Sequence, residues 1–148
     1  MIFDNLEFHP DISDTLKTIK SETFKEHTFQ IVQGLQTLKY SQDTLPPSTS
    51  NNDADLIKIS EWSSKFGVTS LSCTKQGKNK PKYDFCLGNI RKNTPINCEF
   101  HLKLNFNNSG IKIEERDDSG RMYNRLYFGI HMHHGIKKLL VAHIGKHL

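Results

Sequence analysis

Residues 96–106 alternate apolar and polar side chains without a break. The apolar members are Ile96, Cys98, Phe100, Leu102, Leu104 and Phe106. Because successive side chains of a β-strand point to opposite faces, this period of two predicts one strand with a buried face. Glu99, His101 and Lys103 are then expected together on its other face. The apolar face of such a strand needs partners, and the sequence on both sides supplies them.

Short apolar or alternating runs flank this segment and predict partner strands. They are residues 68–73, 83–87, 111–113, 121–130 and 139–142. Turn signals rich in glycine, asparagine, aspartate, histidine or lysine lie between them, at residues 75–82, 107–110, 117–120 and 133–135. Consecutive strands joined by short turns predict an antiparallel meander.

The N-terminal part of the chain follows a helical period instead. Apolar residues recur at intervals of three or four in residues 12–40 and again in residues 55–66. Asp11 is a candidate N-cap for the first segment, and Gly67 is a natural stop for the second. A proline pair places a loop at residues 45–53. The expected fold class is therefore α+β, with N-terminal helices packed on a C-terminal antiparallel sheet.

Charge divides the chain at nearly the same point. Residues 1–64 hold 5 basic and 10 acidic side chains, a net charge of −5, whereas residues 65–148 hold 15 basic and 6 acidic ones, a net charge of +9. A length of 148 residues suits one domain, so residues 1–66 are interpreted as its acidic helical region and residues 67–148 as its basic sheet. The basic region favours a nucleic-acid partner, and the acidic region could fold back over it or bind an inhibitor.

Several functional classes are excluded. No apolar run approaches the roughly 18 residues of a membrane-spanning helix, and the first residues lack the pattern of a secretory signal, so a cytoplasmic protein without a membrane partner is expected. Glycine-rich phosphate loops, nucleotide fingerprints and repeats are absent, and no cofactor is expected. Cys73, Cys86 and Cys98 share no CxxC spacing and are expected to be reduced thiols.

Five of the eight histidines lie in the last 18 residues: His131, His133, His134, His143 and His147. The first three precede Gly135 and are assigned to a hairpin tip, where chance surface histidines are favoured over a metal site. A metal-dependent nuclease would need a lysine two residues after its second carboxylate, but the residue two after Glu99 is His101. No metal is expected.

The candidate catalytic and substrate-binding side chains lie on the outer, polar faces of the predicted strands. Metal-free RNA cleavage requires a base, an acid and fixed cations around the reacting phosphate. Histidine suits both proton transfers because its ordinary pKa is about 6.5. The predicted catalytic residues are His101, His143, His147, Glu99 and Lys103. The predicted substrate-binding residues are Arg121, Arg125, Tyr127 and Lys146.

Residues 121–128, a short hairpin and residues 138–143 together resemble the closing strands of RelE-type ribonuclease toxins. In that family two N-terminal helices pack on a small antiparallel sheet, and the toxin cuts RNA without a metal. The resemblance covers about the last 50 residues. It implies a strand arginine at Arg125, an aromatic at Tyr127, a central-strand cation at Lys103 and a catalytic position at His143 or His147. A longer N-terminal region and the acidic Glu99 depart from the family pattern, and the broader group of barnase-, EndoU-, contact-dependent and colicin-type toxins fits about as well.

Three functions stay open on these grounds. The favoured one is a metal-independent endoribonuclease, acting as a toxin or defence effector. The alternatives are a nucleic-acid-binding module without catalysis and a protein-interaction subunit of a toxin–antitoxin or defence system. RNA is the expected partner, and a cognate inhibitor protein is a candidate second one.

Overall fold

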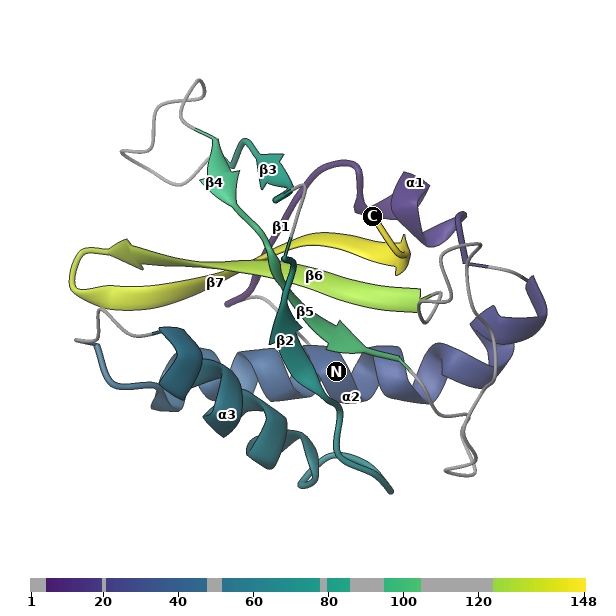
Figure 1. Ribbon diagram of the computed structural model, residues 1–148, viewed down its shortest axis with the longest axis horizontal. Helices are drawn as coiled ribbons and strands as arrows, with labels where there is room; N and C mark the ends of the chain where they lie inside the picture. The colour runs from purple at the N-terminus through teal and green to yellow at the C-terminus, as the bar shows by residue number, and fades with distance from the viewer. Residues whose placement is uncertain (1–4, 20, 48–51, 78–79, 86–94, 105–123) are drawn as a thin grey trace.

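The computed structural model describes residues 5–19, 21–47, 52–77, 80–85, 95–104 and 124–148, with the backbone alone for residues 21–27 and 133. These residues form three helices, a five-stranded sheet and a two-stranded sheet (Figure 1). The helices are α1 (Ile12–Leu16), α2 (Ser21–Thr44) and α3 (Asn52–Ser63). The strands are β1 (Glu7–Phe8), β2 (Cys73–Lys75), β3 (Lys82–Tyr83), β4 (Ile96–Asn97), β5 (Phe100–Lys103), β6 (Asn124–His133) and β7 (Ile136–Lys146). The predicted α+β class is confirmed.

The large sheet has the strand order β1-β7-β6-β5-β2. Strands β5, β6 and β7 form the expected meander, and β2 pairs antiparallel with β5. The described C-terminal strands of this sheet are antiparallel as predicted, but the sheet as a whole is mixed, because the N-terminal β1 pairs parallel with β7, with Glu7 opposite Leu140 and Phe8 opposite Val141. A strand of two residues is too short to show a period of its own, so the sequence pattern gives no sign of it.

The long hairpin β6–β7 turns through two residues, His134 and Gly135. Their φ angles are 49° and 76°, and two positive values in a two-residue loop are the mark of a type I′ turn, whose twist matches that of the strands it joins. The predicted turn is found at residues 134–135, and of the three histidines assigned to the tip only His134 lies in it. His131 and His133 belong to β6 and pair with Lys138 and Ile136 of β7, which corrects the sequence prediction.

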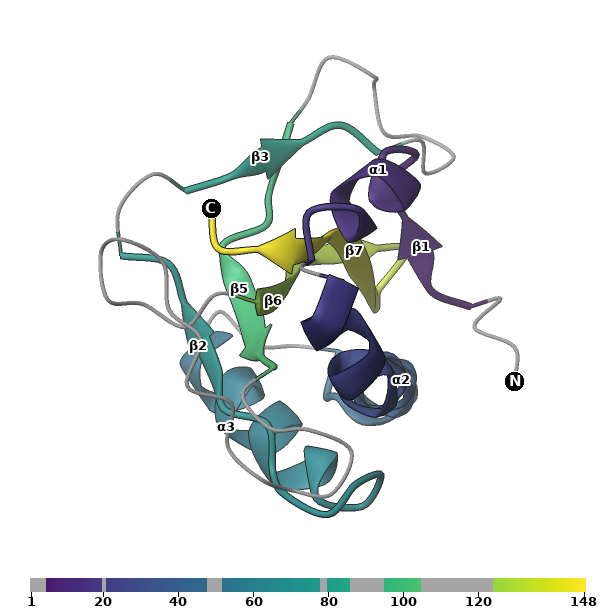
Figure 2. The ribbon, with the colours of Figure 1, turned by 90° about the vertical axis from the view of Figure 1, so that its right-hand side faces the viewer.

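Helices α2 and α3 lie together on one face of the large sheet, as Figure 2 shows. The helical period of residues 12–40 is divided between α1 and α2, and the predicted second helix is α3. The main core between these layers is aliphatic with one phenylalanine pair. Its buried members from β5, β6 and β7, and from the residue that follows β5, are Phe100, Leu102, Leu104, Leu126, Phe128, Leu139, Val141 and Ile144. Within the described residues, no helix combines the length and the apolar character that crossing a membrane requires.

A smaller core lies on the opposite face of the sheet. It consists of Phe85, Ile96, Cys98, Leu140 and Ala142, with Tyr83 packed against it. Strand β4 passes so close over β6 that a Cβ on Gly129 would lie 2.7 Å from the carbonyl oxygen of Asn97. A residue without a side chain is therefore required at the crossing, since the obstacle is backbone and cannot rotate away.

The eleven-residue alternation is not one strand, contrary to the sequence prediction. Its first part is β4, which pairs with β3, and its second part is β5, which belongs to the large sheet. Ile96 and Cys98 contribute to the smaller core, whereas Phe100 and Leu102 contribute to the main core. The chain changes layer between these pairs, and both layers need an apolar residue at every second position, so the sequence period continues across the break.

A register shift in the β6–β7 pairing decides which way His143 points. Tyr127 pairs with His143, but the next residue, Phe128, pairs with Val141, so Ala142 is an extra residue in β7. This irregularity of the β-bulge type changes the phase of the side chains along β7. His143 consequently shares the face of Tyr127, although strict alternation from the buried Val141 would direct it into the main core.

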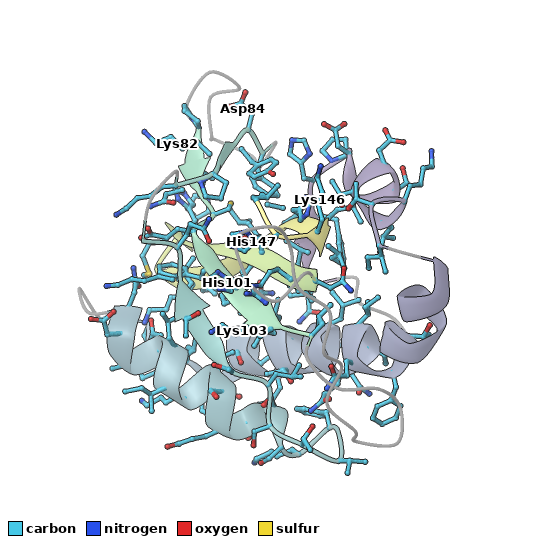
Figure 3. The ribbon with its side chains drawn as sticks, turned by 45° about the vertical axis from the view of Figure 1, so that its right-hand side comes forward. Lys82, Asp84, His101, Lys103, Lys146 and His147 are labelled. Carbon is cyan, nitrogen blue, oxygen red and sulfur yellow. The ribbon has the colours of Figure 1, made fainter. Side chains whose placement is uncertain are left out.

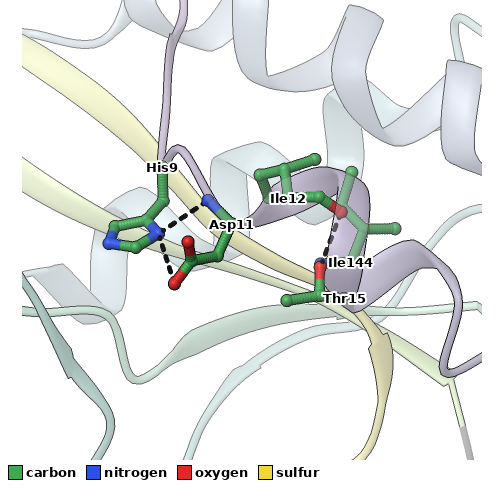
Figure 4. A network of polar contacts seen from close by, with 5 residues as sticks. All are labelled: His9, Asp11, Ile12, Thr15 and Ile144. Atoms are coloured by element: carbon green, nitrogen blue, oxygen red, sulfur yellow. Dashed lines mark hydrogen bonds and ion pairs between the residues drawn. The ribbon is translucent and has the colours of Figure 1, made fainter.

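Helix α1 covers the edge of β7 beyond the short β1. The backbone N–H of Ile144 donates to Thr15 Oγ1 (3.2 Å), and that of Lys146 donates to Thr18 Oγ1 (2.9 Å). Figure 4 shows the first contact beside the turn that leads into α1, where the Asp11 N–H donates to His9 Nδ1 (3.2 Å). Two threonine hydroxyls thus replace a strand partner at this end of β7.

Candidate functional site

Four side chains form a row across the sheet, one from each of β2, β5, β6 and β7. Thr74 is opposite His101, His101 opposite Tyr127, and Tyr127 opposite His143. The ring centroids of His101 and Tyr127 are 5.0 Å apart, and those of Tyr127 and His143 are 5.6 Å apart. This row lies on the face opposite α2 and α3, and it is the polar face that the alternation predicts.

A cleft of about 470 Å³ opens at the β2–β5 end of this row. Its lining residues are Thr74, Lys75, Gln76, Gly77, His101, Lys103, Arg125 and His147. Figure 3 shows His101, Lys103 and His147 near one another, with Lys82 and Asp84 apart from them toward β3. Residues from three strands and from the segment after β7 therefore meet in one hollow.

The cleft is cationic. Lys75, Lys103 and Arg125 line it, and none of its described lining residues is an aspartate or glutamate. At the rim, Lys75 Nζ lies 2.9 Å from Asp53 Oδ1 of α3, and this exposed ion pair raises the pKa of Lys75. The two inner cations, Lys103 and Arg125, are paired with each other in register across β5 and β6. Like charges side by side favour an anion in the space they share.

His101 is almost wholly buried, with 5% of its surface exposed. Its Nε2 lies 3.0 Å from Thr74 Oγ1. Burial and the neighbouring charge of Arg125 lower the pKa of His101 from 6.5 to about 3. The imidazole is therefore neutral at pH 7 and has one nitrogen lone pair available to accept a proton.

The same two causes act on Lys103. Burial, followed by the charge of Arg125, lowers the pKa of the Lys103 ammonium below its ordinary value of 10.5. Arg125 is itself buried, and its Nη1 donates to the carbonyl oxygen of Asn124 (3.4 Å). The charge of Arg125 thus disfavours the charged form of Lys103, and an anion bound beside both groups would offset this effect.

His143 is near the cleft without lining it. Its Nε2 lies 2.8 Å from the carbonyl oxygen of Lys146, and because a carbonyl only accepts, Nε2 carries the proton and donates it. Burial lowers the pKa of His143, which favours the neutral ring in this arrangement. His143 Nε2 is thus already engaged as a hydrogen-bond donor to the backbone of Lys146.

Tyr127 and Glu99 also differ from their sequence-based assignments. Tyr127 is wholly buried, and its ring contacts His101 and His143, so it has no exposed face on which a base could stack. Glu99 precedes β5, lies outside the cleft lining and pairs with Lys80 through Oε2 at 3.2 Å. The Glu99 side chain is therefore not among the groups that line the cleft with His101.

The remaining predicted residues divide as follows. His101, Lys103, Arg125 and His147 are brought together in the cleft. Lys146 is exposed beside His147, and Arg121 lies outside the described residues. Four cleft residues are absent from the predicted catalytic and substrate-binding residues: Thr74, Lys75, Gln76 and Gly77. Alternation from the core-packed Cys73 would have placed Thr74 and Gln76 on the polar face.

The described residues give no support to a metal centre. They contain no group of three or more histidine, cysteine, aspartate or glutamate side chains that could hold a metal ion. Cys73 and Cys98 are free thiols, and burial raises the pKa of Cys98 to about 12, so it is protonated and unreactive at neutral pH. Cys86 lies outside the described residues.

No protein-family model, curated protein or solved structure matches this chain. The site is therefore interpreted from its own geometry and charge.

Proposed function

We propose that this protein is a metal-independent endoribonuclease that cleaves RNA in the cleft between β2, β5 and β6. The observation that supports it most directly is the shared lining of one cationic cleft by His101, His147, Lys103 and Arg125. Two imidazoles can exchange protons with a substrate, and two fixed cations can hold its phosphate. The RelE-type resemblance favours the same activity, and a toxin or defence role depends on that resemblance alone.

In the proposed reaction His101 acts as the base. It accepts the proton of a ribose 2′-hydroxyl that takes the place of the Thr74 hydroxyl at Nε2. Its lowered pKa makes it a weak base in the free protein. A bound phosphate offsets the charges of Arg125 and Lys103 and so removes part of the lowering of that pKa, whereas burial, the larger cause, remains.

His147 acts as the acid in this scheme. The 2′-oxygen forms a bond to phosphorus, the bond from phosphorus to the 5′-oxygen breaks, and the leaving oxygen takes a proton from the His147 imidazolium. The products are a 2′,3′-cyclic phosphate and a free 5′-hydroxyl, so the step consumes no water and no co-reactant. Lys103 and Arg125 stabilise the negative charge that increases on the phosphate oxygens.

The test is incubation of the purified protein with a labelled RNA oligonucleotide in EDTA. A matched oligonucleotide with deoxyribose at every position lacks the attacking hydroxyl. The expected result is cleavage of the RNA to cyclic phosphate ends and no cleavage of the DNA. His101→Gln and His147→Gln, purified in parallel, should each lose about two orders of magnitude or more in rate, as removal of a general acid or base does.

Two results would count against the proposal: RNA that stays intact in all samples, or equal cleavage by the wild type and both variants, which indicates a contaminant. A nucleic-acid-binding module without catalysis is the second candidate, and the near-complete burial of His101 favours it. Salt-dependent RNA binding with no turnover would establish that alternative.

A further inference from the structure

Gln76, Tyr127 and Leu148 form a closed ring of hydrogen bonds at the edge of the cleft. The Gln76 side-chain amide donates through Nε2 to the Leu148 oxygen (2.8 Å), the Leu148 N–H donates to the Tyr127 hydroxyl (3.1 Å), and that hydroxyl donates to Gln76 Oε1 (3.3 Å). Each group gives one hydrogen bond and receives one. Such a cycle fixes the relative positions of its three members more firmly than separate contacts would.

This cycle of hydrogen bonds joins β6 and the end of β2 to residue 148, in the segment that follows β7. Gln76 directly follows β2 and Tyr127 belongs to β6, and both are buried. On the other side of His147, the Lys146 carbonyl accepts from His143 Nε2 (2.8 Å) and the Lys146 N–H donates to Thr18 Oγ1 (2.9 Å). His147 therefore has a backbone anchored on both sides.

We infer that Tyr127, Gln76 and His143 are positioning residues, which hold the backbone of residues 146–148 so that His147 faces His101 across the cleft. This inference rests on the proposed function, and it gives new roles to two residues that the sequence pattern assigns to catalysis and substrate binding. Tyr127 and His143 lie beneath the cleft and act on His147 through the backbone.

The row of buried side chains across the sheet also accounts for the positions of the aromatic rings of Tyr127 and His143. The Tyr127 ring lies between the rings of His101 and His143 and restricts the position of the His101 ring by contact. The Tyr127 hydroxyl accepts from the N–H of Leu148, the residue next to His147. One side chain thus sets the relative position of both groups that would exchange protons with the substrate. Errors of about 1 Å in such a placement can reduce a rate about a hundredfold.

Tyr127→Phe tests the inference because it removes the hydroxyl alone and leaves the ring packing in place. In the protein without RNA, measured by NMR, the Leu148 amide should exchange with solvent at least about tenfold faster, and the His147 ring signals should shift. With RNA as substrate, kcat should fall by about 10-fold to 100-fold while KM changes less than about twofold, because the phosphate-binding cations stay in place. Gln76→Met serves as the second variant if Tyr127→Phe fails to fold.

Tyr40→Phe is the matched control, since it also removes one tyrosine hydroxyl but from α2, on the opposite face of the sheet, where that hydroxyl accepts from Lys65 Nζ. It should leave both the exchange rate and kcat at wild-type values. Unchanged Leu148 exchange and unchanged His147 signals in Tyr127→Phe would overturn the inference. The NMR measurements need no substrate, so they decide the positioning role even if RNA cleavage is absent and the proposed function is wrong.

Discussion

Lys137 Nζ lies 2.7 Å from Asp55 Oδ2, and the two side chains are only 2% and 1% exposed. The contact joins β7 to the first turns of α3, so the acidic and basic regions of the chain meet in the interior. Removing one partner deprives the other buried charge of this ion pair, and breaking a buried ion pair in this way costs about 3–5 kcal/mol in other proteins. Lys137→Met and Asp55→Leu should each lower the free energy of unfolding by an amount of that order, measured by urea denaturation.

The double variant is the control for that prediction. Replacing both groups removes both buried charges, so the double variant should be more stable than either single variant. If the two single losses simply add in the double variant, the two charges do not interact in the folded protein.

Gly129→Ala should destabilise the protein by about 1–3 kcal/mol. The added methyl would lie 2.7 Å from the Asn97 carbonyl oxygen and 3.0 Å from Cys98 Sγ, which forces β4 away from β6. Urea denaturation of the variant measures the loss. The matched control is Gly77→Ala, where an added Cβ meets nothing within 4 Å. Equal effects in the two variants would show that β4 does not cross β6 this closely.

Stability should decrease as the pH falls below about 6.5, through His101. The pKa of this group is lowered to about 3 in the folded protein, while the unfolded chain has the ordinary value of 6.5. Between these two values the unfolded state binds more protons, so acid favours unfolding by up to about 1.4 kcal/mol per pH unit for one such group. His143, whose pKa is also lowered, acts in the same direction.

Urea denaturation at pH 7 and at pH 5 measures this slope. Above pH 5 most carboxylates stay ionised, so the histidines dominate the change. His101→Gln should show a smaller difference between the two pH values than the wild type. An identical difference would mean that His101 is not held neutral by its surroundings.

Lys103→Ala should weaken RNA binding about equally for all sequences, because a cation of this kind contacts phosphate and not bases. The slope of log affinity against log salt concentration should decrease by about 1 for each phosphate that the variant no longer neutralises. Fluorescence anisotropy over a salt series measures both quantities. Lys17→Ala is the control, since Lys17 is an exposed lysine at the end of α1 that pairs with Asp14. A Lys103→Ala slope equal to that of the control would place the bound phosphates outside the cleft.

The meander of β5, β6 and β7 could be predicted from the sequence because each strand buries one face against the helices. The helices α2 and α3 could be predicted for the same reason, from apolar residues at helical intervals. The split between β4 and β5 could not, since a change of layer at Cys98 and Glu99 leaves the period of two intact. Periodicity reports that a residue is buried, and it does not report which layer covers it.

The candidate site could be predicted only in part, for two further physical reasons. Alternation along the strand places His101 and Lys103 on the polar face. His143 reaches the same face only because Ala142 is an extra residue in β7, and no local sequence pattern predicts that irregularity. Alternation predicts a polar face but not what covers it, and β3, β4 and residues 147–148 cover much of this face. Tyr127 is consequently an interior residue in a position where the sequence suggests a contact surface.

Strand β7 is the last of the described elements along the chain, yet it lies inside the sheet, between β1 and β6. During synthesis the helices and β6 are complete before residues 136–146 exist. Until then β1 has no partner among the described strands and one edge of β6 is unpaired, so the sheet cannot close in the order in which it is made. Pairings this distant in sequence slow folding and leave strand edges exposed in the meantime. A newly made chain therefore cannot become a folded protein until residues 136–146 have left the ribosome.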